Sequence, residues 1–274
     1  MHLEKILILA KTYPVPSAKY EETTCVAGIT DNGQMRRLFP IQFRFIDGEK
    51  QFKKWQWISA RVKKAPKDHR AESHIINSES IVCQDVITTD KFWQARKNWI
   101  DLIPSFKNMS QLEKARQEHG VTLALIRPKK MIALDITPED SPNWTQDEIN
   151  KLRKSDTQGD LFRDSEPNKP SLEKIPFAFH YRYILQDDLG NEVEQRHKIL
   201  DWEVCQLYRR LRREKGLSWE GYFREKLENE FFTKDLSLFI GTMQRIPYQW
   251  LIISLIYPPL QPEGSHEQRS FSFS

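Results

Sequence analysis

The chain has 274 residues, of which 39% are hydrophobic and 29% are charged, and its formal net charge is +4. This length suits one large domain or two ordinary ones, with enough apolar residues for a packed core. The three cysteines are odd in number and lack a CxxC spacing, so the sequence supports neither a disulfide framework nor a cysteine-based zinc site. The apolar runs Ile6–Ala10 and Trp250–Tyr257 are too short for a signal peptide or a membrane span. We therefore expect a cytoplasmic protein with no membrane partner.

The first ninety residues have the pattern of a small β-barrel. Alternation and turn residues predict strands over Lys5–Lys11, Thr23–Thr30, Gln34–Pro40, Trp55–Lys63 and Ser80–Thr88. Asn32-Gly33 marks a tight turn, because both residues tolerate positive φ. Five short strands, with a short helical piece near Phe43–Asp47, match the strand count of an OB-type barrel. An SH3-like barrel fits nearly as well.

Helix signals follow the predicted barrel. Asp90 can begin a helix, Ser110 and Glu113 have the spacing of a capping box, and Gly120 suits a helix C-terminus. We therefore predict a helical connector over 91–120. Strands are expected at Val121–Ile126 and Met131–Ile136.

Residues 138–175 differ in composition from the rest, with four Pro and nine Asp or Glu. They predict an exposed acidic insertion, in which Thr145 and Glu148 can cap one short helix. The segment that follows alternates again. It predicts strands from Pro176 to Leu200, a helix capped by Asp201, a second helix from Ser218, and a final strand pair over Leu236–Gln244 and Tyr248–Tyr257.

The resulting fold class is α+β and β-rich, with two OB-like barrels and intervening helices. The first barrel is predicted over residues 1–90. The second is predicted over 121–260, including the insertion at 138–175 and helices at 201–232, and a loose tail is expected at 261–274.

The chain lacks the common catalytic motifs, since GxSxG, GxGxxG, GxxxxGK[ST] and HExxH are all absent. Two weak constellations remain, one of Asp68, His69 and Glu72 and one of His197, Asp201 and Glu203. A solvated loop explains the first more simply, and a helix N-cap with an acidic first turn explains the second. The sequence therefore predicts no catalytic residue, no metal and no cofactor.

Basic and aromatic residues carry the stronger functional signal. Residues 1–70 hold fourteen Lys or Arg against seven Asp or Glu, an excess that would attract phosphate. OB barrels bind single strands by stacking bases on aromatic side chains, while cations follow the phosphates. The candidate nucleic-acid-binding residues are Lys11, Tyr13, Arg36, Arg37, Arg44, Trp55, Trp57 and Arg70. The alternative is that the tryptophans cover a helix and the cations are ordinary surface. Arg209-Arg210 and Arg212-Arg213 add a basic helix face.

Short motifs along the chain carry a family resemblance. Lys11–Ser17, Lys19–Thr23, Cys25–Gly28, Arg37–Ile41, Phe52–Trp55, Asp68–Ser73, Asp201–Glu203, Gly241-Thr242 and Tyr257–Pro259 resemble the bacterial family of dual OB-containing domain proteins. The resemblance extends from about residue 5 to 259 and is most specific in the first block. It implies two OB-like barrels, and through the OB fold it implies nucleic-acid binding.

Three hypotheses follow from these observations. The leading one is a non-enzymatic nucleic-acid-binding protein that favours single strands, as an accessory of a bacterial defence or mobile-element system. The second is an adaptor for a protein partner, with 138–175 as its docking segment. The third is a metal-dependent hydrolase or nuclease built on one of the two weak constellations. The oligomeric state is left open.

Overall fold

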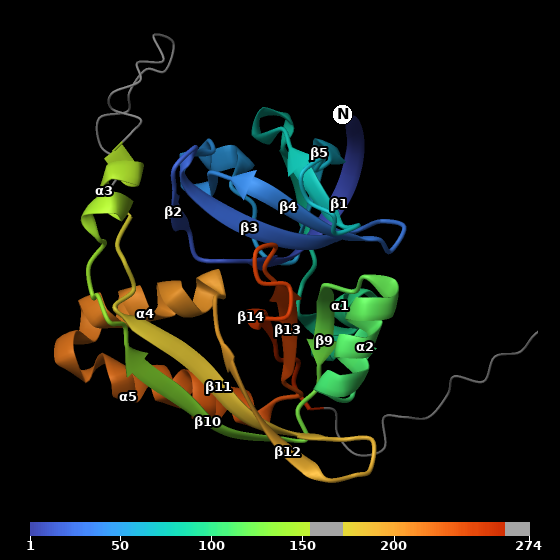
Figure 1. The fold of residues 1–274 in the computed structure, drawn as a ribbon, viewed down its shortest axis with the longest axis vertical. Coiled ribbons are helices and arrows are strands. Elements are labelled where there is room, and N and C mark those ends of the chain that lie inside the picture. Colours follow the sequence, from blue (N-terminus) through green and yellow to red (C-terminus); the bar gives the residue numbers. More distant parts are fainter. Residues whose placement is uncertain (154–171, 261–274) are drawn as a thin grey trace, which may run out of the picture.

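The computed structural model describes residues 1–153 and 172–260. The chain is strand-rich α+β, with a β-barrel built from the N-terminal residues and a second lobe of sheets and helices below it (Figure 1). Residues 154–171 of the predicted acidic insertion and the whole of the predicted tail lie outside the described residues.

Five strands close the first barrel. They are β1 (His2–Lys11), β3 (Glu21–Thr30), β4 (Met35–Ile41), β5 (Gln56–Lys64) and β6 (Ser73–Ile76). Their order around the ring is β1-β3-β4-β6-β5, and β5 returns to pair with β1. The β4–β6 pair is parallel, whereas the other four pairs are antiparallel. The predicted β-barrel is thereby confirmed for this part of the chain.

The fifth barrel strand is not the predicted one. The strand expected over Ser80–Thr88 is β7 (Val82–Val86), which pairs with β5 outside the ring. The ring closes instead through β6, a four-residue strand containing Ser73 and His74. Its four residues, Ser-His-Ile-Ile, give no alternation, so only its partners β4 and β5 define it as a strand. The short strand β2 (Val15–Ser17), which pairs with β3, was also unexpected. The helical piece is present as a 3-10 turn, η1 (Phe43–Phe45), and a second turn, η2 (Gly48–Lys50), follows it.

The connector consists of α1 (Asp90–Ile100), β8 (Ser105–Phe106) and α2 (Met109–His119). The N-cap of α2 is Asn108, whose Oδ1 accepts a hydrogen bond from the Gln111 amide at 2.8 Å. The predicted capping box at Ser110 is therefore wrong, because Ser110 lies inside the helix. Gly120 ends α2 at φ 67°, as the sequence predicts, since glycine adopts this conformation without strain.

The second lobe contains two sheets. One has the order β14-β13-β9-β8 and the other β10-β11-β12, and a single bridge between Ile199 and Ile252 connects them. The new strands are β9 (Leu123–Ile126), β10 (Lys130–Pro138), β11 (Phe177–Gln186), β12 (Glu192–Lys198), β13 (Ser237–Thr242) and β14 (Trp250–Ile256). The predicted strands of this region are present, but among the described residues they hydrogen-bond as two sheets.

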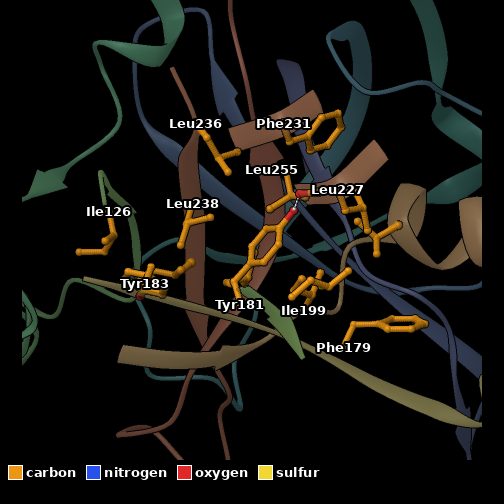
Figure 2. Packing of buried hydrophobic residues seen from close by; sticks show 14 of the residues in the cluster. Ile126, Phe179, Tyr181, Tyr183, Ile199, Leu227, Phe231, Leu236, Leu238 and Leu255 are labelled. Carbon is orange, nitrogen blue, oxygen red and sulfur yellow. Dashed lines mark hydrogen bonds between the residues drawn. The ribbon is translucent and has the colours of Figure 1, made fainter. Parts of the chain in front are cut away.

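Helices share one apolar cluster with strands of both sheets. They are α4 (Trp202–Lys215), α5 (Trp219–Arg224) and the π-helical turn η6 (Glu225–Glu230). The Tyr181 hydroxyl donates to the Leu227 carbonyl at 2.6 Å, so this buried ring is both packed and hydrogen-bonded (Figure 2). The predicted N-cap of α4 is confirmed, because Asp201 accepts from the Glu203 and Val204 amides.

The insertion begins with α3 (Gln146–Arg153), which packs beside β2 and β3 of the first barrel. Thr145 and Glu148 form the predicted capping box. The Thr145 amide donates to Glu148 at 2.8 Å, and the Glu148 amide donates to the Thr145 hydroxyl at 3.3 Å.

A shared apolar cluster joins the two lobes. Ile6 and Ile8 point into the barrel, whereas Leu7 and Leu9, which alternate with them on β1, face outward. That outer face packs against the β9-β13-β14 sheet and α1. The cluster comprises Leu7, Leu9, Ala10, Ala27, Ile29, Trp55, Trp93, Ile100, Ile103, Leu123, Leu125, Phe239, Ile253 and Ile256. The outer face of β1 and β3 is therefore closed to a ligand.

Buried polar contacts border this apolar cluster. The Arg37 guanidinium donates to Glu72 at 3.3 Å and to the Thr122 carbonyl at 3.1 Å, and Glu72 accepts from the Thr122 hydroxyl. A Cβ added to Gly241 would lie 3.3 Å from the Arg37 guanidinium, so this position favours glycine. A second arginine, Arg70, donates to a carbonyl of β13 at 2.8 Å. The lobes thus meet through hydrogen bonds of buried charged side chains as well as apolar packing.

Replacement of Glu72 by alanine should lower the free energy of unfolding by about 3 kcal/mol, because it leaves the buried Arg37 without its carboxylate. Urea unfolding followed by tryptophan fluorescence would measure the change. The control is Glu79→Ala, which removes an exposed ion pair with Lys50 and should cost about 0.5 kcal/mol. Equal losses for the two variants would contradict a structural role for the Arg37–Glu72 pair.

Candidate functional site

The end of β1 meets the start of α4, on the side of the second lobe that faces the barrel (Figure 1). Thr12 forms a β-bridge with Asp201, and the Tyr13 amide donates to the Leu200 carbonyl at 2.9 Å. The Trp202 ring lies 5.9 Å from the Tyr13 ring. These contacts bring together two motifs that are almost 190 residues apart, Lys11–Tyr13 and Asp201–Glu203.

Lys11 occupies an aromatic environment at this junction. Its ammonium group lies 4.1 Å from the centre of the Phe43 ring and donates to the Phe52 carbonyl at 3.0 Å. Burial lowers the pKa of Lys11 to about 8, although the nearby Glu203 and Asp201 carboxylates act to raise it. Lys11 is therefore a cation that can lose its charge at mildly alkaline pH.

Tyr13 and Arg44 border the same junction. The Tyr13 hydroxyl donates to the Glu173 carbonyl at 2.7 Å, and burial raises the pKa of Tyr13 to about 12. This hydroxyl therefore remains a donor at neutral pH. Arg44, on the 3-10 turn after β4, donates to Glu22 at 3.2 Å. Arg209 of α4 donates to the Glu173 carboxylate at 2.9 Å.

The outward face of α4 is basic. Val204, Tyr208 and Leu211 form the buried stripe of the helix. Arg210 and Arg213 are exposed on the other side, and Arg209 is half-buried beside them. Helical spacing places these arginines on one face, because residues three and four apart are neighbours. We use the name α4 junction for the surface formed by Lys11, Tyr13, Arg44, Trp202, Arg209, Arg210 and Arg213.

Three of the predicted nucleic-acid-binding residues are internal, which corrects their assignment to a binding surface. Arg37 and Arg70 are buried between the lobes and hydrogen-bond across the interface. Trp55 is 3% exposed and packs against Trp93 and Arg96. None of the three can reach a ligand without disrupting these contacts.

Two further predicted residues lie away from the α4 junction. Arg36 donates to both carboxylate oxygens of Glu4 at 2.8 Å, at one end of the barrel. The pKa of Glu4 falls to about 2, chiefly because of this hydrogen-bonded ion pair. Trp57 packs edge-on against Trp99 with ring centres 4.9 Å apart. The tryptophan thus covers a helix, which is the alternative that the sequence leaves open.

The weak catalytic constellations do not converge on a site. His197 contacts the Tyr183 hydroxyl at 2.9 Å, and burial lowers the pKa of His197 to about 4. Asp201 is a buried helix cap that also accepts from the Leu255 amide, whereas Glu203 is exposed. In the other constellation, Asp68 pairs with Arg70, Glu72 pairs with Arg37, and His69 is exposed. In residues 1–153 and 172–260, no three His, Cys, Asp or Glu side chains are grouped to hold a metal ion.

A pocket of about 390 Å³ opens between β4 and residues 120–123. Arg36, Glu72 and Thr122 line it. These polar residues already have protein partners, since Arg36 pairs with Glu4 and Glu72 binds Arg37 and Thr122. The pocket therefore offers a ligand fewer uncommitted charged groups than the α4 junction does.

The sequence identifies Lys11, Tyr13 and Arg44 as candidates, and the structure brings them together with α4. The sequence does not indicate that Trp202 and Glu173 belong to the same surface. Trp202 was visible only as part of a short family motif, and Glu173 belonged to the acidic insertion. Both signals are local, whereas the contacts of Tyr13 with Glu173 and Trp202 join residues more than 150 positions apart.

The fold and the junction define a two-lobed protein whose barrel is fused to a helix-containing second lobe. Residues 2–102 match a family model described as a domain of unknown function, DUF8758. Residues 105–273 match a second one, the domain of unknown function DUF8757, so the chain belongs to the DUF8757 family. No curated protein matches the chain. Within the part of the chain that the structure describes, no helix is long and apolar enough to cross a membrane.

The Lys11 amine should titrate near pH 8, well below the ordinary lysine value of 10.5, because burial disfavours its charged form. NMR of the protein after reductive methylation with ¹³C-formaldehyde would follow each dimethyl-lysine signal, and Lys11→Met would identify this one. Glu203→Gln should lower the pKa of Lys11 further, since it removes a nearby negative charge.

Between about pH 8 and 10.5 the folded protein binds fewer protons at Lys11 than the unfolded chain does, so the free energy of unfolding should rise with pH. A Lys11 signal titrating with the surface lysines would contradict this interpretation.

Proposed function

We propose that the protein binds nucleic acid through phosphate contacts at the α4 junction. The observation that supports this most directly is the exposed arginine face of α4, beside Arg44 of the barrel. Arginine binds phosphate oxygens through its planar fork of donors, and phosphate contacts supply most of the affinity in sequence-independent binding. The surface is built to position a polyanion rather than to read bases.

The barrel provides a second argument. We propose that the first barrel is of the OB type, which agrees with its five strands and its closure. OB barrels bind ligands on the face of their second and third strands and with the loop between the first two. The second lobe covers part of that face here, where Arg37 of β4 and Ala27 of β3 are buried. The loop after β1 carries Tyr13 and lies beside α4, so we assign it as a ligand-binding element.

The proposed binding mode differs from base stacking. Trp55 and Trp57, the tryptophans expected to stack on bases, pack against other tryptophans. Binding would therefore rest on charge, with strong salt dependence and little preference for sequence. Duplex and single-stranded oligonucleotides should compete for the same surface. The second lobe, with its two bridged sheets, would serve to hold α4 against the barrel.

The charge-reduced variant Arg210→Gln/Arg213→Gln should bind a fluorescent 20-nucleotide strand and its duplex about tenfold more weakly at 50 mM salt. It should also reduce the slope of log K against log salt by about 1 to 2, since each lost phosphate contact removes about 0.9 from a duplex slope. Fluorescence anisotropy across a salt series measures both quantities. The matched control is Lys107→Gln/Lys114→Gln, which removes two exposed charges next to and within α2.

Equal weakening by the two double variants would contradict binding at the α4 junction and would indicate diffuse attraction to a basic protein. Failure of the wild type to bind either oligonucleotide at low salt would contradict nucleic-acid binding itself. Co-purification of a stoichiometric protein without nucleic acid would favour an adaptor instead.

A further inference from the structure

Glu173 places a carboxylate among the arginines of the α4 junction. Its Oε2 accepts from Arg209 Nε at 2.9 Å. Arg213, one turn further along α4, and Arg44, from the barrel, are close enough to act on the same carboxylate electrostatically. Arginines from both lobes therefore act on one acidic side chain, which Arg209 contacts directly and which belongs to neither the barrel nor α4.

The backbone at Glu173 is fixed from two sides. The Tyr13 hydroxyl donates to the Glu173 carbonyl at 2.7 Å. The preceding residue, Leu172, is buried, and its carbonyl accepts from the Trp144 indole at 2.6 Å. Lys174, the following residue, lies 5.3 Å from the centre of the Trp144 ring. The position of the carboxylate beside Arg209 is thus set by the packing of its neighbours.

The Glu173 carboxylate is ionised at neutral pH and open to solvent. The hydrogen bond from Arg209 is the main reason that its pKa lies below the ordinary value, and Arg213 and Arg44 add to the effect. The side chain is 66% exposed, whereas that of Arg209 is 27% exposed. An exposed ion pair of this kind is weak, so a ligand with more than one anionic oxygen can displace it.

We propose that Arg44, Arg209 and Arg213 form a phosphate subsite that the Glu173 carboxylate occupies when no ligand is bound. A carboxylate and a phosphodiester are recognised by the same guanidinium geometry, so Glu173 acts as an internal competitor. The inference rests on the proposed function, since it takes the ligand to be a nucleic-acid phosphate. It adds a regulatory contact: binding requires Glu173 to leave Arg209.

The competing interpretation is that Glu173 only ties its segment to α4. A purely structural tie would change stability on mutation and leave ligand affinity unaltered. Competition for Arg209 would change affinity in a direction opposite to that of the arginine variants. The two interpretations therefore predict different results in the same binding assay.

The test compares Glu173→Gln with Glu214→Gln by fluorescence anisotropy, using the 20-nucleotide strand at 50 mM salt. Both variants remove one negative charge near α4, but Glu214 is an exposed residue of the helix itself and has no ion pair among the described residues. Glu173→Gln should tighten binding about three- to fivefold, as expected for loss of one exposed ion-pair competitor. Glu214→Gln should tighten it less than twofold.

The Arg209→Gln background completes a double-mutant cycle. There the gain from Glu173→Gln should largely disappear, because the arginine for which carboxylate and phosphate compete is gone. A gain of equal size with and without Arg209, or equal gains for Glu173→Gln and Glu214→Gln, would overturn the inference while leaving nucleic-acid binding intact. An unchanged affinity in Glu173→Gln would do the same.

A second probe distinguishes failure of nucleic-acid binding from failure of the phosphate subsite. If neither the wild type nor Glu173→Gln binds an oligonucleotide, inorganic pyrophosphate is titrated against both and followed by NMR of the arginine Nε groups. Shifts that appear only in Glu173→Gln would preserve the phosphate subsite and contradict nucleic-acid binding. Absence of shifts in both proteins would overturn the subsite as well.

Discussion

The arrangement of the molecule depends on the burial of the outer face of β1 and β3 against the β9-β13-β14 sheet. The apolar run from Ile6 to Ala10 has no polar face, because alternate residues fill the barrel interior and the contact between the lobes. Burying both faces of a strand is a large hydrophobic contribution that neither lobe can obtain alone. It fixes where β1 ends relative to Leu200, and hence places Tyr13 beside α4.

Paired charges surround this apolar contact and define its geometry. Arg37 with Glu72, Arg70 with Asp68, and Lys54 near Asp201 all lie at the boundary between the lobes. Such pairs add little net stability, since desolvation offsets their attraction, but an unpaired member is costly. Of the three, the Lys54–Asp201 pair crosses between the lobes, so it disfavours arrangements in which the lobes dock differently. Lys54 also donates to the Leu255 carbonyl at 2.6 Å, which ties the loop before β5 to β14.

Local patterns in the sequence predict most elements but not their partners. Alternation locates the long strands, and Asp201, Thr145 and Gly120 mark helix ends correctly, because strand pattern and capping depend on nearby residues. The strand β6 is missed because its register is set by β4 and β5. Arg37 and Arg70 resemble surface cations by residue type. Their burial is decided by Thr122 and Thr242, which lie 85 and 172 residues further along the chain.

The second lobe covers part of the strand face of the first barrel, and this changes what the proposed site can recognise. An open face offers aromatic rings to bases, whereas a loop beside a basic helix offers charge to the backbone. Selectivity among anionic ligands would then depend on competition with the Glu173 carboxylate and on the spacing of the arginines. In the binding mode that we propose, the Arg209–Glu173 pair would supply both, since one phosphate would replace the carboxylate while others would meet Arg210 and Arg213 along the helix. A lone anion gains only the first contact, so a ligand with regularly spaced phosphates gains more from the same surface.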